Sequence, residues 1–237
     1  MVTVDSEEIA KFERMAHEWW EPEGKFKLLH QINPLRVGYI CTQLTGQEQG
    51  DLTGLHILDI GCGGGILAEA LAQRGATVTG IDRSERIIGI AKAHQQESGS
   101  KVDYRVQAAE ALAAQSPHHF DVVLAMEVLE HVPDIHLFIE QCALLLKPQG
   151  HFFFATLNRT LQSWVMAIIG AEYILRWLPR GTHTYDKFVR PSELDQALRQ
   201  VGIHLCDLRG MSYHPLRHAF HLSQNPQVNY LGFGKRE

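Results

Sequence analysis

Short apolar runs alternate with segments of helical periodicity through the middle of the chain. Glycine, proline and polar residues bound each run, which is typical of strands that are buried on both faces. Strands are expected at residues 55–60, 77–81, 102–106, 120–125 and 152–156. Helices are expected at residues 66–74, 85–98 and 134–146. This alternation predicts a parallel sheet with helices packed on both of its faces.

The two ends of the chain follow other patterns. Apolar residues at helical spacing predict an amphipathic helix over residues 6–20. Asn33 and Pro34 predict the N-cap and the first residue of a second helix, which Gly46 ends. Towards the C-terminus, helices are expected at residues 160–178 and 191–201, and two closing strands, paired as a hairpin at the sheet edge, at residues 203–211 and 228–234.

Together these elements predict a single α/β domain with a doubly wound, Rossmann-like sheet. Residues 1–50 are expected to form a helical N-terminal cap, and residues 51–157 the cofactor-binding core. Residues 158–190 are expected to form an apolar lid or a membrane-facing segment. A C-terminal helix and the closing strands are expected at residues 191–237.

Composition narrows the class of protein and its partners. The 237 residues are 45% hydrophobic and 21% charged, which is ordinary for one globular domain. The net charge is −5 and no basic stripe is present, so nucleic acid is not an expected partner. The four cysteines form no CxxC pair, so we expect neither a zinc site nor a disulfide framework. Residues 1–12 lack the apolar core of a signal peptide, and the expected location is the cytoplasm.

The strongest motif is the glycine-rich turn at residues 59–65, DIGCGGG, between an expected strand and an expected helix. Glycine allows close backbone approach to a ligand, and the start of the helix offers free N–H groups. Asp82 ends the next strand about 20 residues later, where an acidic side chain accepts the hydroxyls of a ribose. We therefore expect an adenosine cofactor that contacts Gly61, Gly63 and Asp82. The alternative is a tight strand–helix turn without a ligand.

The same turn favours S-adenosylmethionine over a dinucleotide. The dinucleotide fingerprint GxGxxG needs a third glycine where this chain has Ile66. Asp59, beside the turn, would repel a pyrophosphate and would suit a cationic sulfonium ligand with a free amino group. S-adenosylmethionine is the expected cofactor, with NAD as the alternative.

A second group of reactive side chains follows the fourth expected strand. Glu127, Glu130 and His131 have i, i+3 and i+4 spacing, which places them on one face if the segment is helical. Two carboxylates and an imidazole can bind a divalent cation such as Mg²⁺; the alternative is a solvated helix start. Met126 is a candidate contact to the adenosine, with core packing as its alternative. Glu110 is a further candidate near the adenine.

With these residues in place, the chain resembles the class I S-adenosylmethionine-dependent methyltransferases and, among them, the ubiquinone-biosynthesis O-methyltransferase family. The resemblance covers nearly the whole chain and is less clear after Gly210. Besides the glycine turn, it is carried by residues 8–13 (EIAKFE), 30–36 (HQINPLR), 127–132 (EVLEHV) and 170–175 (GAEYIL). The glycine turn is common to many methyltransferases, whereas the NPLR and GAEYIL segments are much more specific.

The resemblance implies a seven-stranded sheet with the last strand antiparallel. It also implies both O-methylations of polyprenylated catechol or hydroxyphenyl intermediates on the way to ubiquinone. The alternatives are a methyltransferase for another small phenolic or amine metabolite and a non-enzymatic S-adenosylmethionine-binding protein.

The resemblance also implies roles for individual residues. Arg36, which would otherwise be a solvated surface residue, is implied to bind the methionine carboxylate through its guanidinium fork. Some members of the family depend on a divalent metal, which supports a cation at Glu127, Glu130 and His131. A phenol has a pKa of about 10, so its methylation near neutral pH needs a base or a cation. His131 is the expected catalytic base, and a cation that stabilises the catecholate is the alternative.

The apolar segment after the fifth strand has two interpretations, which are compatible. It is either a helix that covers the pocket or an interfacial segment that rests on an anionic membrane surface, since Arg176, Arg180 and Lys187 accompany it. The second interpretation predicts peripheral association with the inner membrane. The chain is also expected to join a complex with other ubiquinone-biosynthesis proteins.

Overall fold

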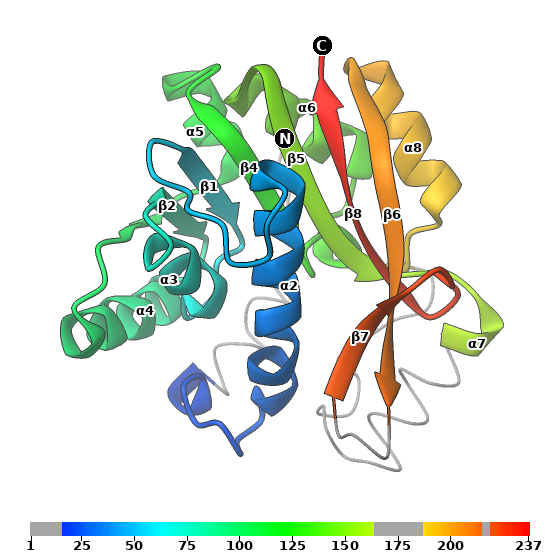
Figure 1. The fold of residues 1–237 in the computed structure, drawn as a ribbon. Helices are drawn as coiled ribbons and strands as arrows, with labels where there is room; N and C mark the ends of the chain where they lie inside the picture. Colours follow the sequence, from blue (N-terminus) through cyan, green and yellow to red (C-terminus); the bar gives the residue numbers. More distant parts are fainter. Residues whose placement is uncertain (1–15, 164–186, 215–218) are drawn as a thin grey trace.

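The computed structural model describes residues 16–163, 187–214 and 219–237. Most of the expected amphipathic helix at 6–20 and of the apolar segment at 160–178 therefore lies outside the described residues. One eight-stranded sheet forms the centre of the described chain, in the order β3-β2-β1-β4-β5-β8-β6-β7 (Figure 1). Its strands are β1 (His56–Ile60), β2 (Thr77–Asp82), β3 (Asp103–Val106), β4 (Phe120–Met126), β5 (Leu146–Leu157), β6 (Ile203–His214), β7 (Ala219–Ser223) and β8 (Asn229–Arg236).

The strand directions confirm the doubly wound prediction. The five strands from β3 to β5 in the sheet run parallel to one another. The last strand, β8, is antiparallel, as the resemblance implied, but it lies between β5 and β6 and not in a hairpin at the sheet edge. The eighth strand, β7, was not expected; it pairs with the far end of β6 and extends the sheet at that edge.

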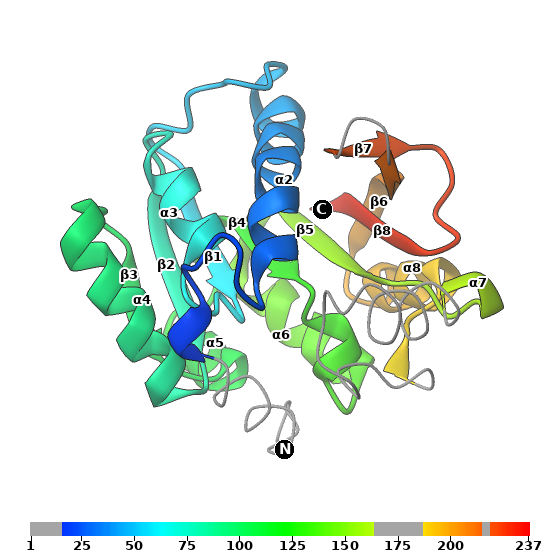
Figure 2. The same cartoon turned by 90° about the horizontal axis from the view of Figure 1, so that it is seen from below.

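Helices cover both faces of this sheet, as Figure 2 shows from below. The described helical elements are η1 (Ala16–Glu18), α2 (Lys27–Thr45), α3 (Ile66–Ala72), α4 (Glu85–Ser98), α5 (Ala109–Gln115), η2 (Leu129–His131), α6 (Ile135–Leu145), α7 (Leu161–Ser163) and α8 (Pro191–Gln200). Helices α2, α3 and α4 pack on one face and α5, α6 and α8 on the other, so the domain has two apolar cores.

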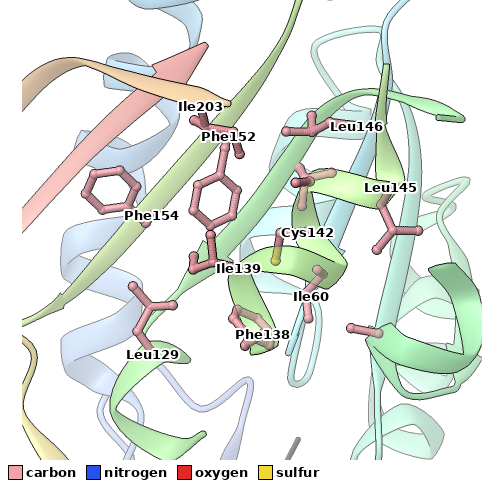
Figure 3. Packing of buried hydrophobic residues seen from close by; sticks show 14 of the residues in the cluster. Ile60, Leu129, Phe138, Ile139, Cys142, Leu145, Leu146, Phe152, Phe154 and Ile203 are labelled. Atoms are coloured by element: carbon pink, nitrogen blue, oxygen red, sulfur yellow. The ribbon is translucent and has the colours of Figure 1, made fainter. Parts of the chain in front are cut away.

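Strand β5 supplies side chains to both cores because neighbouring residues of a strand point to opposite faces. Phe152 and Phe154 pack with Phe138 and Ile139 of α6 (Figure 3). Phe153, between them, belongs to the core beneath α2 and α3. The continuous apolar run of this strand is thus explained by its burial on both sides.

The start of α2 differs from the prediction. The helix begins at Lys27, and Pro34 lies inside it rather than at its first turn. The side chain of Asn33 does not cap the helix; its amide donates to the carbonyl oxygen of Ile66 at 3.1 Å. Long-range packing of the preceding segment therefore overrides the local capping signal. No helix among the described residues is long and apolar enough to cross a membrane.

Candidate active site

The glycine turn follows β1 at the carboxyl edge of the sheet, where doubly wound folds bind ligands. Gly61 and Gly63 have φ angles of +68° and +56°, which disfavour any residue with a Cβ. The amides of Gly61 and Cys62 donate to the carbonyl oxygen of Ile81 at 2.8 and 3.1 Å. The turn is thereby fixed against the end of β2.

Asp82, the last residue of β2, lies directly against this turn. One carboxylate oxygen accepts the Gly63 amide at 3.3 Å, and the other accepts the Ser84 amide at 2.9 Å. The structure therefore brings together the turn and the acidic residue that the sequence placed 21 positions apart (61 to 82). Glu110, at the start of α5, is close by, since it pairs with Arg83 at 3.4 Å.

Arg36 reaches the same edge of the sheet from α2. Arg36 is only 5% exposed, so its interpretation as a solvated surface arginine is wrong. Its Nη2 donates to Oε1 of Glu127 at 2.7 Å, while its Nε has no hydrogen-bond partner among the described residues. The Nε–H donor of the guanidinium is thus left for another acceptor.

Asp59 is a buried acid within the electrostatic reach of Arg36. Burial, opposed by the charge of Arg36 and assisted by that of Asp82, raises the pKa of Asp59 to about 7. A buried carboxyl group of this kind is costly to ionise unless a cation lies beside it. The environment of Asp59 therefore favours a positively charged ligand group next to the glycine turn.

The segment after β4 is not the helix that would place its three reactive side chains on one face. Glu127 has a φ angle of +57°, and only residues 129–131 form a short 3₁₀ turn, η2. Glu130 is buried and accepts a hydrogen bond from Thr156 Oγ1 at 2.6 Å. Burial, together with the nearby charge of Glu127, raises the pKa of Glu130 to about 7, and His131 opposes the shift.

These three side chains do not form a metal-ligand group in this structure. In the described parts of the chain, no three acidic, histidine or cysteine side chains are gathered in that way. The donor types nevertheless fit a divalent cation, because Oε1 of Glu130 is buried and has no hydrogen-bond partner within the described residues. Glu127, by contrast, is occupied by Arg36.

Met126 ends β4 and is buried in the core beneath α2. It directly precedes the reactive segment, at the carboxyl end of the strand that pairs with β1. Core packing and a contact to the adenosine are compatible at this position.

Two tryptophans at the glycine turn were not predicted as part of the site. Trp20 Nε1 donates to the carbonyl oxygen of Gly64 at 2.9 Å. The ring of Trp19 lies where a Cβ on Gly63 or Gly64 would be. The sequence signal was an adjacent pair of large aromatics, but nothing in the local spacing connected it to a turn more than forty residues away (20 to 64).

Comparisons with known proteins find relatives over the whole chain. A methyltransferase-domain family model matches residues 40–206. The ubiquinone biosynthesis O-methyltransferase of Thiobacillus denitrificans is 50% identical over 237 residues, all of both chains. The protein of the same name from Bordetella pertussis is 52% identical over 97% of this chain and 93% of its own length.

Solved structures show the same fold at lower identity. The magnesium protoporphyrin IX methyltransferase of Synechocystis PCC 6803, solved with bound SAH, aligns with a TM-score of 0.68 and 22% identity. That alignment covers 96% of this chain and 95% of the other.

Proposed function

Because the chain belongs to the ubiquinone biosynthesis O-methyltransferase family, we propose that it methylates the ring hydroxyls of polyprenylated catechol and hydroxyphenyl intermediates. The methyl donor is S-adenosylmethionine, and one site serves both O-methylation steps. The observation that carries this proposal is the convergence of the glycine turn, Asp82 and Arg36 at one edge of the sheet.

Each of these groups has a distinct task in binding the donor. The Asp82 carboxylate accepts the ribose hydroxyls, and the backbone of Gly61 and Gly63 approaches the nucleoside. Met126 flanks the adenosine. Arg36 uses its unpartnered Nε side to bind the methionine carboxylate, as a charge-assisted hydrogen bond.

Asp59 complements the positive part of the same ligand. The ammonium and sulfonium groups of S-adenosylmethionine favour the ionised form of this buried carboxyl group. The donor thus places its carboxylate beside a cation and its amine beside an anion, which fixes its orientation in the pocket.

The transfer needs alignment and one proton acceptor. The acceptor oxygen attacks the methyl carbon, and the electrons of the carbon–sulfur bond return to sulfur, which leaves S-adenosylhomocysteine. The protein holds the oxygen, carbon and sulfur in line, and the cofactor supplies the activated methyl group. His131 accepts the phenol proton, since it follows β4 directly at this edge of the sheet.

A divalent cation such as Mg²⁺ is a second part of the proposal. Glu127, Glu130 and His131 would hold it, and it would stabilise the catecholate when bound. Activity lost with a chelator and restored by Mg²⁺ supports this part; full activity in chelator contradicts it and leaves His131 as the base.

The expected surroundings of the site remain predictions. Residues 164–186 lie outside the described part of the chain, so the lid and membrane interpretations of residues 158–190 are both open to test. Co-flotation with anionic liposomes supports peripheral association with the inner membrane, and its absence contradicts it. Co-purification would test the expected complex with other ubiquinone-biosynthesis proteins.

The central test is a methyl transfer assay. The protein is incubated with S-adenosylmethionine and a catechol that bears a short prenyl chain, and the products are analysed by mass spectrometry. We expect the acceptor to gain the mass of one methyl group. An unmodified acceptor, together with no binding of S-adenosylmethionine in calorimetry, would overturn the proposal.

A further inference from the structure

The unexpected strand β7 builds a hairpin at the edge of the carboxyl ends of the strands. Strand β6 runs in the same direction as β5, because both are antiparallel to β8. Its pairing with β8 ends at Gly210, and from there β6 pairs only with β7. The hairpin therefore continues past the sheet on the side where β4 ends at Met126 and where α2 begins (Figure 1).

One face of this hairpin is turned towards α2. Asp207 of β6 accepts a hydrogen bond from the hydroxyl group of Tyr39 on α2, at 3.0 Å. Alternate residues of a strand share a face, so Met211 and Tyr213 lie on the same side as Asp207. Strand β7 itself contacts α2, which fixes this orientation.

Apolar side chains line that face from the core outwards. Met211 pairs with Leu222, and Tyr213 pairs with Phe220 one step further from the sheet. Met211 is buried in the same core as Met126. The Tyr213 and Phe220 rings are 5.0 Å apart and half-buried. On this face the apolar side chains thus continue from Met211, in the core, to the half-buried Tyr213–Phe220 pair.

The other side of the cofactor turn is already covered. Trp19 packs on Gly63 and Gly64, and Trp20 bonds to the carbonyl oxygen of Gly64. The hairpin lies at the β6–β7 end of the same sheet, on the other side of β4 from the glycine turn.

We propose that the outer part of this hairpin face, formed by Leu222, Tyr213 and Phe220, binds the isoprenoid chain of the acceptor while its ring lies beside Met126. This inference rests on the proposed function. An isoprenoid chain is apolar and carries regularly spaced methyl groups, so it gains most from a continuous apolar strip. The Tyr213–Phe220 pair contacts the chain units beyond the ring, and it selects prenylated over unprenylated acceptors.

The test compares two acceptors and two variants. The acceptors are a catechol with a two-unit prenyl chain and the same catechol with a methyl group in its place. Phe220→Ala is expected to raise the KM of the prenylated acceptor about tenfold, as expected for a lost apolar contact, and to leave the KM of the methyl acceptor nearly unchanged. The kcat and the KM of S-adenosylmethionine should stay at wild-type values.

The matched control is His221→Ala, which removes a side chain from the opposite face of the same strand. His221→Ala should leave the KM of both acceptors unchanged. Phe220→Leu should have a KM for the prenylated acceptor close to that of the wild type. Equal losses for the two acceptors, an effect of His221→Ala as large as that of Phe220→Ala, or a wild-type KM in Phe220→Ala would each overturn the inference. If the wild-type enzyme methylates neither acceptor, the proposed function fails as well, and the two failures are distinguished.

Discussion

At the scale of single residues, the main feature of this site is a buried arginine, Arg36, with acidic side chains around it. Arg36 faces Glu127 at 2.7 Å and lies within electrostatic reach of Asp59. Both acids belong to the carboxyl edge of the sheet, although they are far apart in the sequence. A ligand with a carboxylate and an ammonium group can therefore exchange partners with the protein without leaving a buried charge unpaired.

The proposed ribose contact of Asp82 predicts a defined loss of affinity. Asp82→Asn keeps an oxygen for the Ser84 amide but removes the negative charge that would accept the ribose hydroxyls. We expect S-adenosylmethionine to bind about 10- to 100-fold more weakly, as for the loss of charged hydrogen bonds. Isothermal titration calorimetry measures this, and Asp103→Asn, an exposed acid on β3, should bind normally. Unchanged affinity in Asp82→Asn would rule out the ribose role.

The raised pKa of Asp59 predicts a pH-dependent stability. In the folded protein this group has a pKa of about 7, above its ordinary value of 3.8, so the folded state favours the neutral carboxyl group. Below pH 4 the carboxyl group is neutral in both the folded and the unfolded state and does not affect the unfolding free energy. Between pH 4 and 7 it ionises in the unfolded state before it does so in the folded state, so folding becomes progressively less favourable. The ligand-free Asp59→Asn variant should therefore have a Tm above that of the wild type at pH 8 and equal to it near pH 4. A Tm difference that stays constant over this range would contradict the assignment.

At the scale of elements, the N-terminal cap and the glycine turn are one packed unit. Trp19 lies against Gly63 and Gly64 and stacks on Phe26, while the main-chain carbonyl of Trp19 bonds to His30 of α2 at 2.9 Å. The absence of a Cβ at Gly63 and Gly64 thus makes room for the indole ring, in addition to the cofactor contact proposed for the turn.

This packing predicts that Gly63→Ala is more damaging than its backbone angle alone requires. A Cβ at Gly63 would overlap the Trp19 ring, whereas a Cβ at Gly99, which has a similar positive φ of +71°, meets no atom within 4 Å. Gly99→Ala should cost about 1 kcal/mol of unfolding free energy, and Gly63→Ala about 2–4 kcal/mol. Urea unfolding measures both. In a Trp19→Ala background the excess cost of Gly63→Ala should disappear; if it persists, Trp19 is not its cause.

At the scale of the whole molecule, the alternation of strands and helices was sufficient to predict the doubly wound sheet. Burial on both faces makes a strand apolar throughout, and β5 is the clearest case. Strand β7 escaped prediction because its sequence, AFHLS, is short and lacks a run of apolar residues. Contacts such as that of Arg36 with Glu127 could not be predicted from local sequence patterns, because the two residues are 91 positions apart and only the fold brings them together.

The two cores predict where the molecule is sensitive to truncation of side chains. Phe154 is fully buried between β5 and the helices of the α6 face, so Phe154→Ala should lower the unfolding free energy by about 3–5 kcal/mol. Leu161 is 72% exposed, and Leu161→Ala should change the unfolding free energy by less than about 0.5 kcal/mol. Urea denaturation of both variants checks this contrast, and similar losses would contradict the described core.

The position of β8 has a consequence for folding during synthesis. The final strand of the chain is inserted between β5 and β6, which have no direct pairing with each other among the described strands. During synthesis, the first five strands can assemble while β6 and β7 still lack their neighbour. The sheet is therefore completed only when β8 has been made, and a nascent chain that stalls before it lacks the strand that joins β6 and β7 to the rest of the sheet.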